Sequence, residues 1–332
     1  MTQDRRLRAL SFYAIVMTAL ATADVANAAD KFIYGLNWLP QAEHCGFFQA
    51  KARGYYDALG LDVELYPGGP SLNMPQLVAA GRVDAAMGTA LTTLNMRANN
   101  INGVTVAAFL QKTPQTLVAH PDPALQTLTD LKSRKIAVAN TSRSQFWVWL
   151  KTAYGFDDSQ LRPYSYSPSA FVADKTMVQQ GYITEDEFFL GKALGGTPKS
   201  FLLADYGYPE YATTVFTMEQ LINARRDVLA RFLEGSTKGW VDCIRGDPRP
   251  AFDLILATSP EQSLELSAFK IAQIKRLNLV DGGDAAKLGI GAITDERWKN
   301  LFDIMSAGGV YAKDLDYRKA FTDQFVTRKA GQ

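Results

Sequence analysis

Segments typical of strands and helices alternate along most of this chain, and this alternation restricts the fold more than any other feature of the sequence. Short apolar or alternating runs are followed by longer segments in which apolar residues have helical spacing. Such alternation is typical of α/β folds, in which helices cover the faces of mostly parallel strands. The pattern stops near residue 116 and restarts at residue 117, so we expect two separate sheets.

The expected strands and helices fall into two successive groups. In the first group we expect strands at residues 31–37, 61–65, 83–87 and 104–109 and helices at residues 47–53, 71–80 and 91–98. In the second group we expect strands at residues 117–119, 135–139 and 201–204, a helix at residues 145–154, and a returning strand at residues 213–217. The remainder is expected to be mostly helical, at residues 228–246, 248–257, 260–277 and 295–307.

The length of the chain favours two lobes. About 300 residues remain after a predicted N-terminal signal, which is more than one hydrophobic core usually holds. Because a returning strand follows the second group, we expect the chain to come back to the first sheet. We therefore predict that lobe one comprises residues 29–116 plus 212–332, that lobe two, residues 117–211, is inserted, and that the two crossings form a hinge.

The first 28 residues have the features of a secretory signal peptide. Arg5, Arg6 and Arg8 give a positive start, residues 9–21 are apolar, and residues 26–28 match the small-x-small cleavage pattern. The apolar run is shorter than the ~20 residues that a membrane-spanning helix needs. We therefore favour cleavage over an uncleaved anchor, and expect a protein that acts outside the cytoplasm without inserting into a membrane.

The composition argues against several classes of function. The 35 basic and 34 acidic residues nearly cancel, so we expect no binding to nucleic acid. With two His, two Cys and no pair at ligand spacing, we expect no metal site. No nucleophile elbow, P-loop or dinucleotide-binding glycine motif is present. Secretion would permit a disulfide between Cys45 and Cys243, but we favour two buried free thiols.

A polar and aromatic segment follows the first expected strand, where ligands of open α/β sheets bind. Trp38 offers a flat face to a heteroaromatic ring, and Gln41 and His44 can each donate and accept hydrogen bonds. The alternatives are a Trp that fills the core and polar side chains that cap the next helix. We include Asn37, Trp38, Gln41 and His44 in the candidate site and expect Glu43 to face solvent.

Several segments together resemble one known protein family. They are Asn37-Trp38-x-Pro40 with His44 and Gly46, Gly54-Tyr55-Tyr56 followed by Gly60-Leu61-Asp62-Val63, Gly81-Arg82-Val83-Asp84, and Asp130-Leu131-Lys132 followed by Ile136-Ala137-Val138. In order and spacing they resemble periplasmic solute-binding proteins of ABC importers, in the group that binds nitrate, sulfonates and thiamine-pyrimidine precursors. The resemblance implies a type II periplasmic-binding-protein fold, with a mixed sheet flanked by helices in each lobe and the ligand cleft between the lobes. It also implies delivery of the ligand to a permease in the inner membrane.

A fungal enzyme of the same superfamily, which makes the thiamine pyrimidine, is the alternative from another class. That enzyme has a pyridoxal-phosphate lysine and a sacrificial histidine just after the segment that corresponds to residues 81–84, and a run of cysteines later. The corresponding positions here are Gly88 and Thr92, and residues 211–216 contain no cysteine. Without the lysine the chain lacks the amine for a Schiff base. We therefore expect no catalytic residues, no cofactor and no enzymatic activity.

Further candidate contacts lie where other strands end. Backbone N–H groups at Gly88 and Thr89 can hold an acceptor atom, and a glycine allows close approach of a ligand. Thr141 and Ser142 can act similarly in lobe two, although their hydroxyls can instead cap the helix. Arg143 would favour an anionic ligand if it faced the cleft, and the alternative is an exposed side chain in the first helical turn.

The resemblance adds candidates near the hinge and in lobe two. In the family a strand close to Tyr182 ends in a loop with an acidic residue, here Glu185, which could accept from an exocyclic amine. The alternative for Glu185 is a solvated carboxylate, because two more acidic residues follow it. Asp205 and Tyr206 end the next strand and are included, whereas His120 is expected to be structural.

We therefore predict a monomeric periplasmic binding protein that captures a small, planar, nitrogen-rich molecule of the thiamine-pyrimidine-precursor type. Stacking and hydrogen bonding would hold this ligand, and the protein would deliver it to an ABC permease. The alternative within the binding class is an alkanesulfonate, nitrate or another small organic anion. A receptor module for a sensor is a further alternative.

Overall fold

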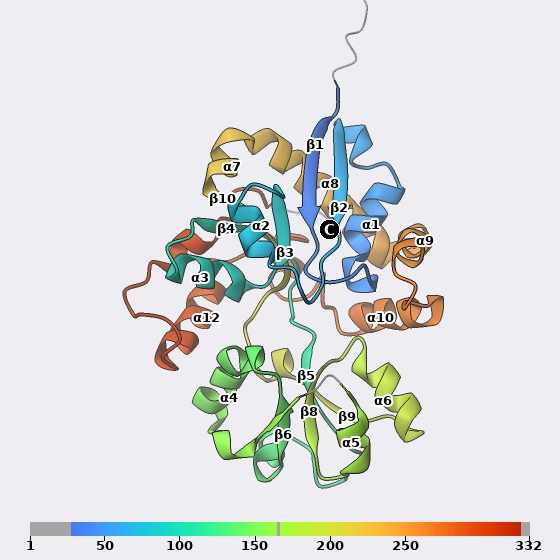
Figure 1. The fold of residues 1–332 in the computed structure, drawn as a ribbon, viewed down its shortest axis with the longest axis vertical. Coiled ribbons are helices and arrows are strands. Elements are labelled where there is room, and N and C mark those ends of the chain that lie inside the picture. Colours follow the sequence, from blue (N-terminus) through green and yellow to red (C-terminus); the bar gives the residue numbers. More distant parts are fainter. Residues whose placement is uncertain (1–27, 165–166, 327–332) are drawn as a thin grey trace, which may run out of the picture.

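Two five-stranded sheets, one above the other in Figure 1, form the framework of the molecule. The computed structural model describes residues 28–164 and 167–326. The expected signal peptide therefore lies outside the described residues, apart from Ala28. Below, lobe one denotes the first sheet with its helices and lobe two denotes the second sheet with its helices.

The sheet of lobe one is mixed and is built from both ends of the chain. Its strands, in spatial order, are β2 (Leu61–Tyr66), β1 (Asp30–Gly35), β3 (Ala85–Gly88), β10 (Ala212–Met218) and β4 (Gly103–Leu110). Strand β1 pairs in parallel with β2 and β3, whereas β10 runs antiparallel to β3 and β4. The returning strand expected at residues 213–217 thus lies inside the first sheet.

The sheet of lobe two is also mixed. Its strands, in spatial order, are β7 (Leu161–Pro163), β6 (Ile136–Val138), β8 (Val178–Tyr182), β5 (Gln115–Ala119) and β9 (Lys199–Leu202). Strand β6 is parallel to β7 and β8, and β5 is antiparallel to β8 and β9. Strand β5 begins at Gln115, two residues ahead of the expected start of lobe two.

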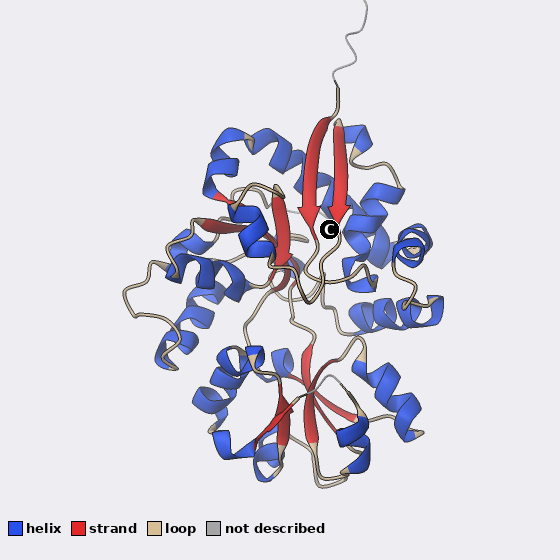
Figure 2. Ribbon diagram, viewed as in Figure 1, coloured by secondary structure: helices blue, strands red, loops and turns tan. Residues whose placement is uncertain are grey.

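Helices flank both sheets (Figure 2), so the architecture is the expected two-lobe α/β fold. Those of lobe one are α1 (Cys45–Ala52), α2 (Met74–Ala79), α3 (Ala90–Ala98), α7 (Glu219–Ala224), α8 (Arg226–Arg245), α9 (Arg249–Thr258), α10 (Leu264–Arg276), α11 (Ala285–Leu288) and α12 (Asp295–Ala307). Those of lobe two are α4 (Phe146–Tyr154), α5 (Ser169–Ala173) and α6 (Asp186–Leu194). Short 3₁₀ turns are η1 (Ala42–His44), η2 (Asp57–Leu59), η3 (Leu128–Ser133), η4 (Thr141–Ser144), η5 (Asp158–Gln160), η6 (Leu203–Tyr206) and η7 (Tyr317–Ala320).

The chain crosses between the lobes at residues 111–114 and 203–211, and one arginine of α12 holds both crossings. Arg297 donates from Nε to the carbonyl oxygen of Pro209 over 2.7 Å and from a terminal nitrogen to the carbonyl oxygen of Gln111. Its guanidinium also lies 4.0 Å from the ring centre of Tyr211. Both crossings are therefore anchored to lobe one.

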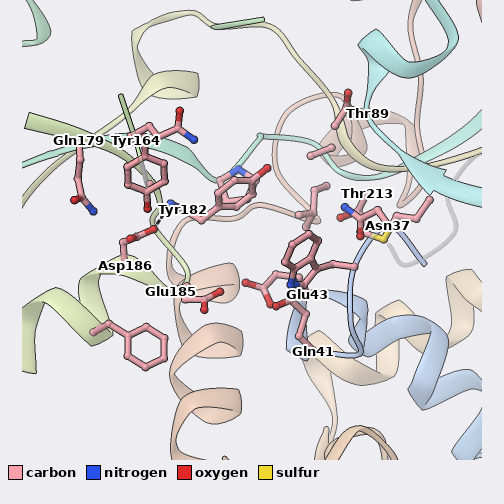
Figure 3. Close-up of a pocket in the computed structure, with 18 of the residues that line it drawn as sticks. Asn37, Gln41, Glu43, Thr89, Tyr164, Gln179, Tyr182, Glu185, Asp186 and Thr213 are labelled. Atoms are coloured by element: carbon pink, nitrogen blue, oxygen red, sulfur yellow. Dashed lines mark hydrogen bonds between the residues drawn. The ribbon is translucent and has the colours of Figure 1, made fainter. Parts of the chain in front are cut away.

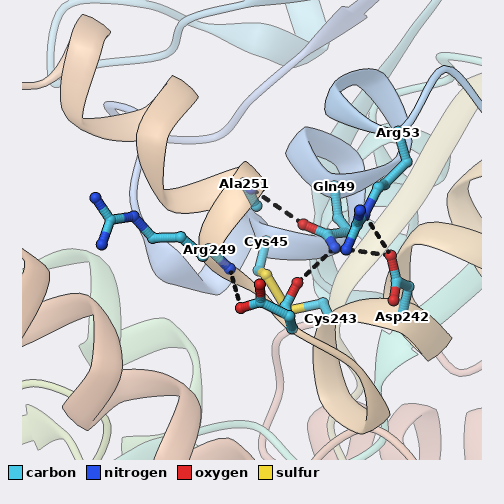
Figure 4. The surroundings of a disulfide bond; sticks show 8 residues. Cys45, Gln49, Arg53, Asp242, Cys243, Arg249 and Ala251 are labelled. Atoms are coloured by element: carbon cyan, nitrogen blue, oxygen red, sulfur yellow. Dashed lines mark hydrogen bonds and ion pairs between the residues drawn. A yellow bond between two sulfur atoms is a disulfide. The ribbon is translucent and has the colours of Figure 1, made fainter.

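The expectation of two free thiols is wrong, because Cys45 and Cys243 form a disulfide between α1 and α8 (Figure 4). The two helices approach closely at glycines: a Cβ on Gly46 would lie 2.2 Å from the indole of Trp240, and one on Gly239 would lie 2.0 Å from the carbonyl oxygen of Gly46. This packing brings the two Cα atoms to 6.2 Å although 198 positions separate them in the sequence. The linkage fixes the helix that follows η1.

The described part of the chain contains neither a membrane-spanning helix nor a metal-binding cluster. None of its helices combines the length and the apolar character needed to cross a bilayer. Its His, Cys, Asp and Glu side chains also do not gather in a group of three that could hold a metal ion.

Candidate ligand-binding site

A cavity of about 590 Å³ lies between the lobes, at the ends of strands from both sheets (Figure 3). Its volume lies within the range of about 300–1,000 Å³ that is typical of small-molecule sites. Residues of lobe two, such as Gln179, Tyr182 and Asp186, lie on one side of the view in Figure 3, and Asn37 and Thr213 of lobe one lie on the other. The lining residues are Asn37, Trp38, Gln41, Glu43, Met87, Gly88, Thr89, Leu110, Pro114, Tyr164, Pro168, Gln179, Gln180, Gly181, Tyr182, Glu185, Asp186, Phe189, Leu190, Ala212 and Thr213.

Large aromatic side chains line the cavity from both lobes. Trp38 follows β1 in lobe one, Tyr182 ends β8 in lobe two, and Phe189 lies on α6. Their exposed fractions are 44%, 44% and 46%, although most aromatic residues of this chain are buried. Exposed aromatic surface that faces a cavity is typical of a site that a ligand covers.

The loop between β1 and α1 is held by a buried histidine. The ring of His44 lies 3.1 Å from Asn37 Oδ1 through Nε2 and accepts the backbone N–H of Gln41 at Nδ1 over 3.3 Å. Nδ1 is thus the acceptor, so Nε2 carries the proton and donates to Asn37. Burial, helped by the charge of Lys270, lowers the pKa of His44 to about 3. The ring is therefore neutral and positions Asn37 without lining the cavity itself.

Glu43 does not face solvent as expected, because its side chain is buried beside the cavity. The hydroxyl of Thr184 donates to Glu43 Oε1 over 2.7 Å, and Glu43 Oε2 lies 3.2 Å from Lys270 Nζ. Thr184 belongs to lobe two, so this carboxylate joins the lobes. A buried carboxylate is stable only with such partners.

Lys270 of α10 is the cation that compensates the carboxylates of the cavity wall. Its side chain has no exposed surface, and Nζ donates to Glu185 Oε2 over 2.9 Å and to Gln41 Oε1 over 3.1 Å. Burial alone would lower the pKa of Lys270, but the charges of Glu43 and Glu185 outweigh it and leave the pKa above its ordinary value. Lys270 is therefore charged at every physiological pH.

Asp186 is the first residue of α6, and it also lines the cavity. Its Oδ2 accepts the backbone N–H of Tyr182 over 2.6 Å. Burial raises the pKa of Asp186 to about 6, against the opposing effects of that hydrogen bond and of Lys270. Asp186 thus titrates close to neutral pH, while Glu185 beside it is paired with Lys270.

The polar lining is rich in acceptors and poor in positive charge. Among the described lining residues there are three carboxylates, Glu43, Glu185 and Asp186, and no Lys, Arg or His. Lys270 touches three lining side chains, but its three contacts are directed at them. The wall therefore favours a neutral ligand, or one rich in N–H donors, over an anion.

The end of β3 supplies a compact backbone wall. Gly88 and Thr89 line the cavity, and the backbone N–H of Thr89 is held by Thr92 Oγ1 over 3.0 Å. A Cβ on Gly88 would lie 2.7 Å from that same Thr92 oxygen, so glycine is needed here for packing. On the neighbouring strand β10, Thr213 has a φ of 46°, a left-handed conformation that is uncommon for a threonine and is found at functional sites.

Seven of the twelve residues proposed from the sequence line the cavity, and five do not. Those that line it are Asn37, Trp38, Gln41, Gly88, Thr89, Tyr182 and Glu185. His44 lies behind Asn37, as described above. Thr141 and Ser142 follow β6 and do not line the cavity. At the end of β6 the side chain of Gln180 in β8 accepts the backbone N–H of Ala139 over 2.7 Å. Tyr164 and Pro168 of lobe two line the cavity instead.

The remaining two candidates and the ambiguous arginine lie elsewhere. Asp205 and Tyr206 follow the edge strand β9, which is not adjacent to β8; Asp205 pairs with Lys112 over 2.8 Å, and the Tyr206 carbonyl oxygen accepts from Tyr154. Arg143 is exposed in a separate, shallow depression with Trp147, Lys151 and Asp158. His120 bonds the Phe171 carbonyl oxygen over 2.6 Å and stacks on the Phe171 ring, in line with a structural role.

Several residues at or behind the cavity were missed, and four of them left a signal in the sequence. Asp186, Phe189 and Leu190 have i, i+3, i+4 spacing, so they form one face of a helix that starts directly after Glu185. Lys270 replaces an apolar residue on the buried stripe of α10 that also contains Leu266 and Ile274. A charged residue on such a stripe indicates a buried ionic partner.

Comparison with known proteins assigns the chain to a family. A family model described as NMT1/THI5 like matches residues 41–251, which is more than half of the chain. The chain belongs to the NMT1/THI5-like family. This agrees with the solute-binding family recognised from the sequence.

Individual relatives of this NMT1/THI5-like chain cover most of its length. Riboflavin-binding protein RibY of Chloroflexus aurantiacus is 24% identical over 318 residues, which are 93% of this chain and 90% of RibY. The formylaminopyrimidine-binding protein of Halalkalibacterium halodurans is 24% identical over 78% of this chain and 79% of its own length. The structure of the periplasmic aliphatic sulphonate binding protein SsuA from Escherichia coli is similar with a TM-score of 0.63 at 15% identity, covering 91% of this chain and 94% of SsuA. The last similarity confirms the periplasmic-binding-protein fold.

Proposed function

We propose that this protein is the solute-binding component of an ABC importer and that it captures a planar, uncharged nitrogen heterocycle between its lobes. The observation that carries this proposal is the lining of the cavity, which combines exposed aromatic side chains from both lobes with carboxylates and amides and has no cationic residue among those described. Binding would involve no bond breaking. Delivery to an inner-membrane permease and a periplasmic location follow from the family and belong to the same proposal.

Stacking would supply much of the affinity. A flat ring between Trp38 of lobe one and Tyr182 or Phe189 of lobe two would cover surface that is now exposed. Each aromatic pair contributes about 0.5–1.5 kcal/mol beyond the burial of apolar area. Because the two walls belong to different lobes, a stacked ligand would also hold the lobes together.

Hydrogen bonding would select the ligand. Glu185 and Asp186 can accept from amino or imino N–H groups, and such charge-assisted bonds are about twice as strong as neutral ones. The amide of Asn37 has its oxygen engaged by His44, so its NH₂ group remains to donate to a ring nitrogen or carbonyl oxygen. This pattern matches aminopyrimidines and flavin-type rings, which carry donors and acceptors on one edge.

Two sizes of heterocycle fit the proposal. A thiamine-type pyrimidine is the ligand expected from the sequence, and the relative from Halalkalibacterium halodurans is named for a formylaminopyrimidine. The cavity volume, which lies in the range for drug-sized ligands, and the relative RibY, named for riboflavin, favour a larger ring system such as a flavin. We rank the flavin-type ligand first on volume.

The alternatives lack support from the cavity. A sulfonate or nitrate would need a cation, and Arg143 lies in a separate depression of lobe two. A pyrimidine synthase of the fungal type would need a lysine at the position of Gly88, where a Cβ would meet Thr92 and Phe216 within about 3 Å.

Titration of the purified chain with riboflavin, lumichrome, a 4-amino-2-methylpyrimidine and ethanesulfonate tests the proposal. We expect a micromolar or tighter Kd for at least one heterocycle, which corresponds to a binding free energy of about −8 kcal/mol. Binding should also raise the melting temperature of the protein, and stacking should quench the fluorescence of a flavin. Ethanesulfonate should give no shift, and Arg143→Ala should leave heterocycle binding unchanged. Binding of ethanesulfonate alone, or loss of binding in Arg143→Ala, would overturn the proposal.

A further inference from the structure

A single buried ammonium group organises the polar wall of the cavity from behind. Lys270 Nζ contacts Gln41 over 3.1 Å, Glu43 over 3.2 Å and Glu185 over 2.9 Å, and all three side chains line the cavity. Lys270 itself is not a lining residue, and its side chain has no exposed surface. It therefore acts on a ligand only through these neighbours.

The three partners of Lys270 come from both lobes. Gln41 and Glu43 belong to the loop after β1 in lobe one, whereas Glu185 precedes α6 in lobe two. The hydroxyl of Thr184 reaches back from lobe two to Glu43 over 2.7 Å, so the same cluster is bridged twice. Any separation of the lobes at this edge would break the contact between Lys270 and Glu185.

The other described contacts between α6 and α10 do not involve a fully buried cation. Lys192 and Glu265 pair over 3.1 Å, but their side chains are 57% and 69% exposed, so solvent screens this pair. The rings of Phe188 and Phe269 lie 5.4 Å apart at their centres. Glu187 of α6 is also largely buried, accepts from Gln273 Nε2 of α10 over 2.8 Å and lies 3.9 Å from the exposed Arg276. Among these described contacts the Lys270 cluster is the one whose cation has no exposed surface, so losing a partner there leaves a buried charge uncompensated.

We propose that Lys270 is a positioning residue of this site: it holds Gln41, Glu43 and Glu185 in their binding orientations and couples that arrangement to the observed position of lobe two against lobe one. In its absence, Glu43 and Glu185 would face each other as two carboxylates without a cation. Both carboxylates lie within 3.2 Å of the same Nζ, so without it two like charges would remain close together, which favours uptake of a proton by one of them. Binding would then depend on pH in a way that it does not when the ammonium is present.

The test compares Lys270→Met with Lys270→Met/Glu43→Gln, and uses Lys192→Met as the matched control for an exposed pair between the same helices. Two quantities are measured at pH 5 and pH 8: the thermal unfolding midpoint without ligand, and the Kd for riboflavin and a 4-amino-2-methylpyrimidine. The charge of Lys270 also lowers the pKa of His44 on η1 and of Asp186 on α6, so both pKa values should rise in Lys270→Met and in the double variant alike. Each variant is expressed as a ratio to the wild type at the same pH, and the comparison of the single with the double variant isolates the effect of Glu43.

We expect the Kd of Lys270→Met to be at least about tenfold higher than that of wild type at pH 8, which is the equivalent of one pKa unit. The ratio of the variant Kd to the wild-type Kd should be smaller at pH 5. The unfolding midpoint of Lys270→Met should likewise fall further below wild type at pH 8 than at pH 5. Neutralising Glu43 in the double variant should bring the Kd and the unfolding midpoint most of the way back to wild type. It should also make the remaining loss the same at pH 5 and at pH 8. Lys192→Met should match wild type throughout.

Two outcomes would overturn the inference: the same loss at pH 5 and pH 8 in Lys270→Met, which a purely structural role would give, or no rescue by Glu43→Gln. The inference rests on the proposed function only for the choice of ligands. If the wild type bound neither heterocycle, that choice would fail, and the pH dependence of unfolding without ligand would still decide the role of Lys270.

Discussion

Nε2 of His44 lies 3.1 Å from Oδ1 of Asn37, so a buried neutral ring determines which end of that amide is presented to the cavity. The pKa of His44 is about 3, below its ordinary 6.5, because of burial and Lys270. A histidine with a lowered pKa stabilises the fold above pH 6.5, and that contribution is lost as the pH falls from 6.5 towards 3. We expect His44→Gln, which keeps one acceptor and one donor, to remove this dependence. Relative to the variant, wild type should lose about 2 kcal/mol of unfolding free energy between pH 7 and pH 5.

Denaturant titrations of both proteins at several pH values measure this difference, and Asp186 cancels because both proteins contain it. His44→Leu, which lacks the donor to Asn37, serves as the comparison for binding. We expect a weaker heterocycle affinity for His44→Leu than for His44→Gln. Parallel stability profiles for wild type and His44→Gln would contradict the assignment of a neutral ring.

Trp38 should contribute to binding and hardly to folding. Its side chain is 44% exposed at the cavity, so we expect Trp38→Ala to change the unfolding free energy by less than about 0.5 kcal/mol. Loss of a stacking surface should weaken heterocycle binding by about 2 kcal/mol, or about 30-fold. Leu39 is the matched control, because it is adjacent, 39% exposed and not a lining residue. Isothermal titration of Trp38→Ala and Leu39→Ala checks this, and equal affinities would exclude stacking on the indole.

The alternation of strands and helices could be predicted because the strands of lobe one have recognisable burial patterns. Strands β3 and β4 are buried at every residue, and β2 alternates buried apolar residues with exposed Asp62 and Glu64. Strand β8 lacked that signal, since Gln179 and Gln180 are polar and serve the cavity and the end of β6. Local pattern thus predicts the framework and is weakest where the chain forms the site.

The site could be predicted in lobe one better than in lobe two. Strand ends in lobe one were recognisable, and Asn37, Trp38 and Gln41, which were chosen there as candidate ligand contacts, line the cavity. The partners of Glu43 and Cys45 lie 227 and 198 positions away, and nothing in local spacing indicates which helices will pack together. For such pairs, exposure and redox state depend on tertiary contacts, which the sequence pattern does not contain.

Removal of the disulfide should weaken the fold without removing the cavity. The bond closes a loop of 198 positions, and chain-entropy arguments give up to about 5 kcal/mol for a loop of this length. We expect Cys45→Ala/Cys243→Ala to lower the unfolding free energy by roughly 2–5 kcal/mol, measured by denaturant titration. Heterocycle affinity below the transition should stay close to wild type, because neither cysteine lines the cavity.

Asp186 should make binding depend on pH near 6. Because its pKa is raised, the folded protein holds this proton more tightly than the unfolded chain does. The resulting contribution to the unfolding free energy is complete below pH 3.8 and is lost as the pH rises through about 6. We expect Asp186→Asn to remove this slope, which amounts to about 2 kcal/mol after allowance for solvent screening. A ligand that donates to the carboxylate should bind more tightly above pH 6 than below it in wild type. A flat Kd between pH 5 and pH 7.5 would contradict that role.

Gly181 provides an independent test of Asp186 that retains the carboxyl group but changes its position. A Cβ on Gly181 would lie 2.7 Å from Asp186 Oδ2 and 2.8 Å from its Cγ, so alanine would displace the carboxyl group and break its bond to the N–H of Tyr182. The backbone of Gly181 is ordinary strand, so Gly181→Ala should fold. We expect at least about tenfold weaker binding and loss of the pH effect near 6, as in Asp186→Asn. Gly191→Ala on α6, whose added Cβ would make only an ordinary contact at 3.7 Å, is the matched control and should bind like wild type. Wild-type binding by Gly181→Ala would show that the position of the Asp186 carboxyl group does not matter to the ligand.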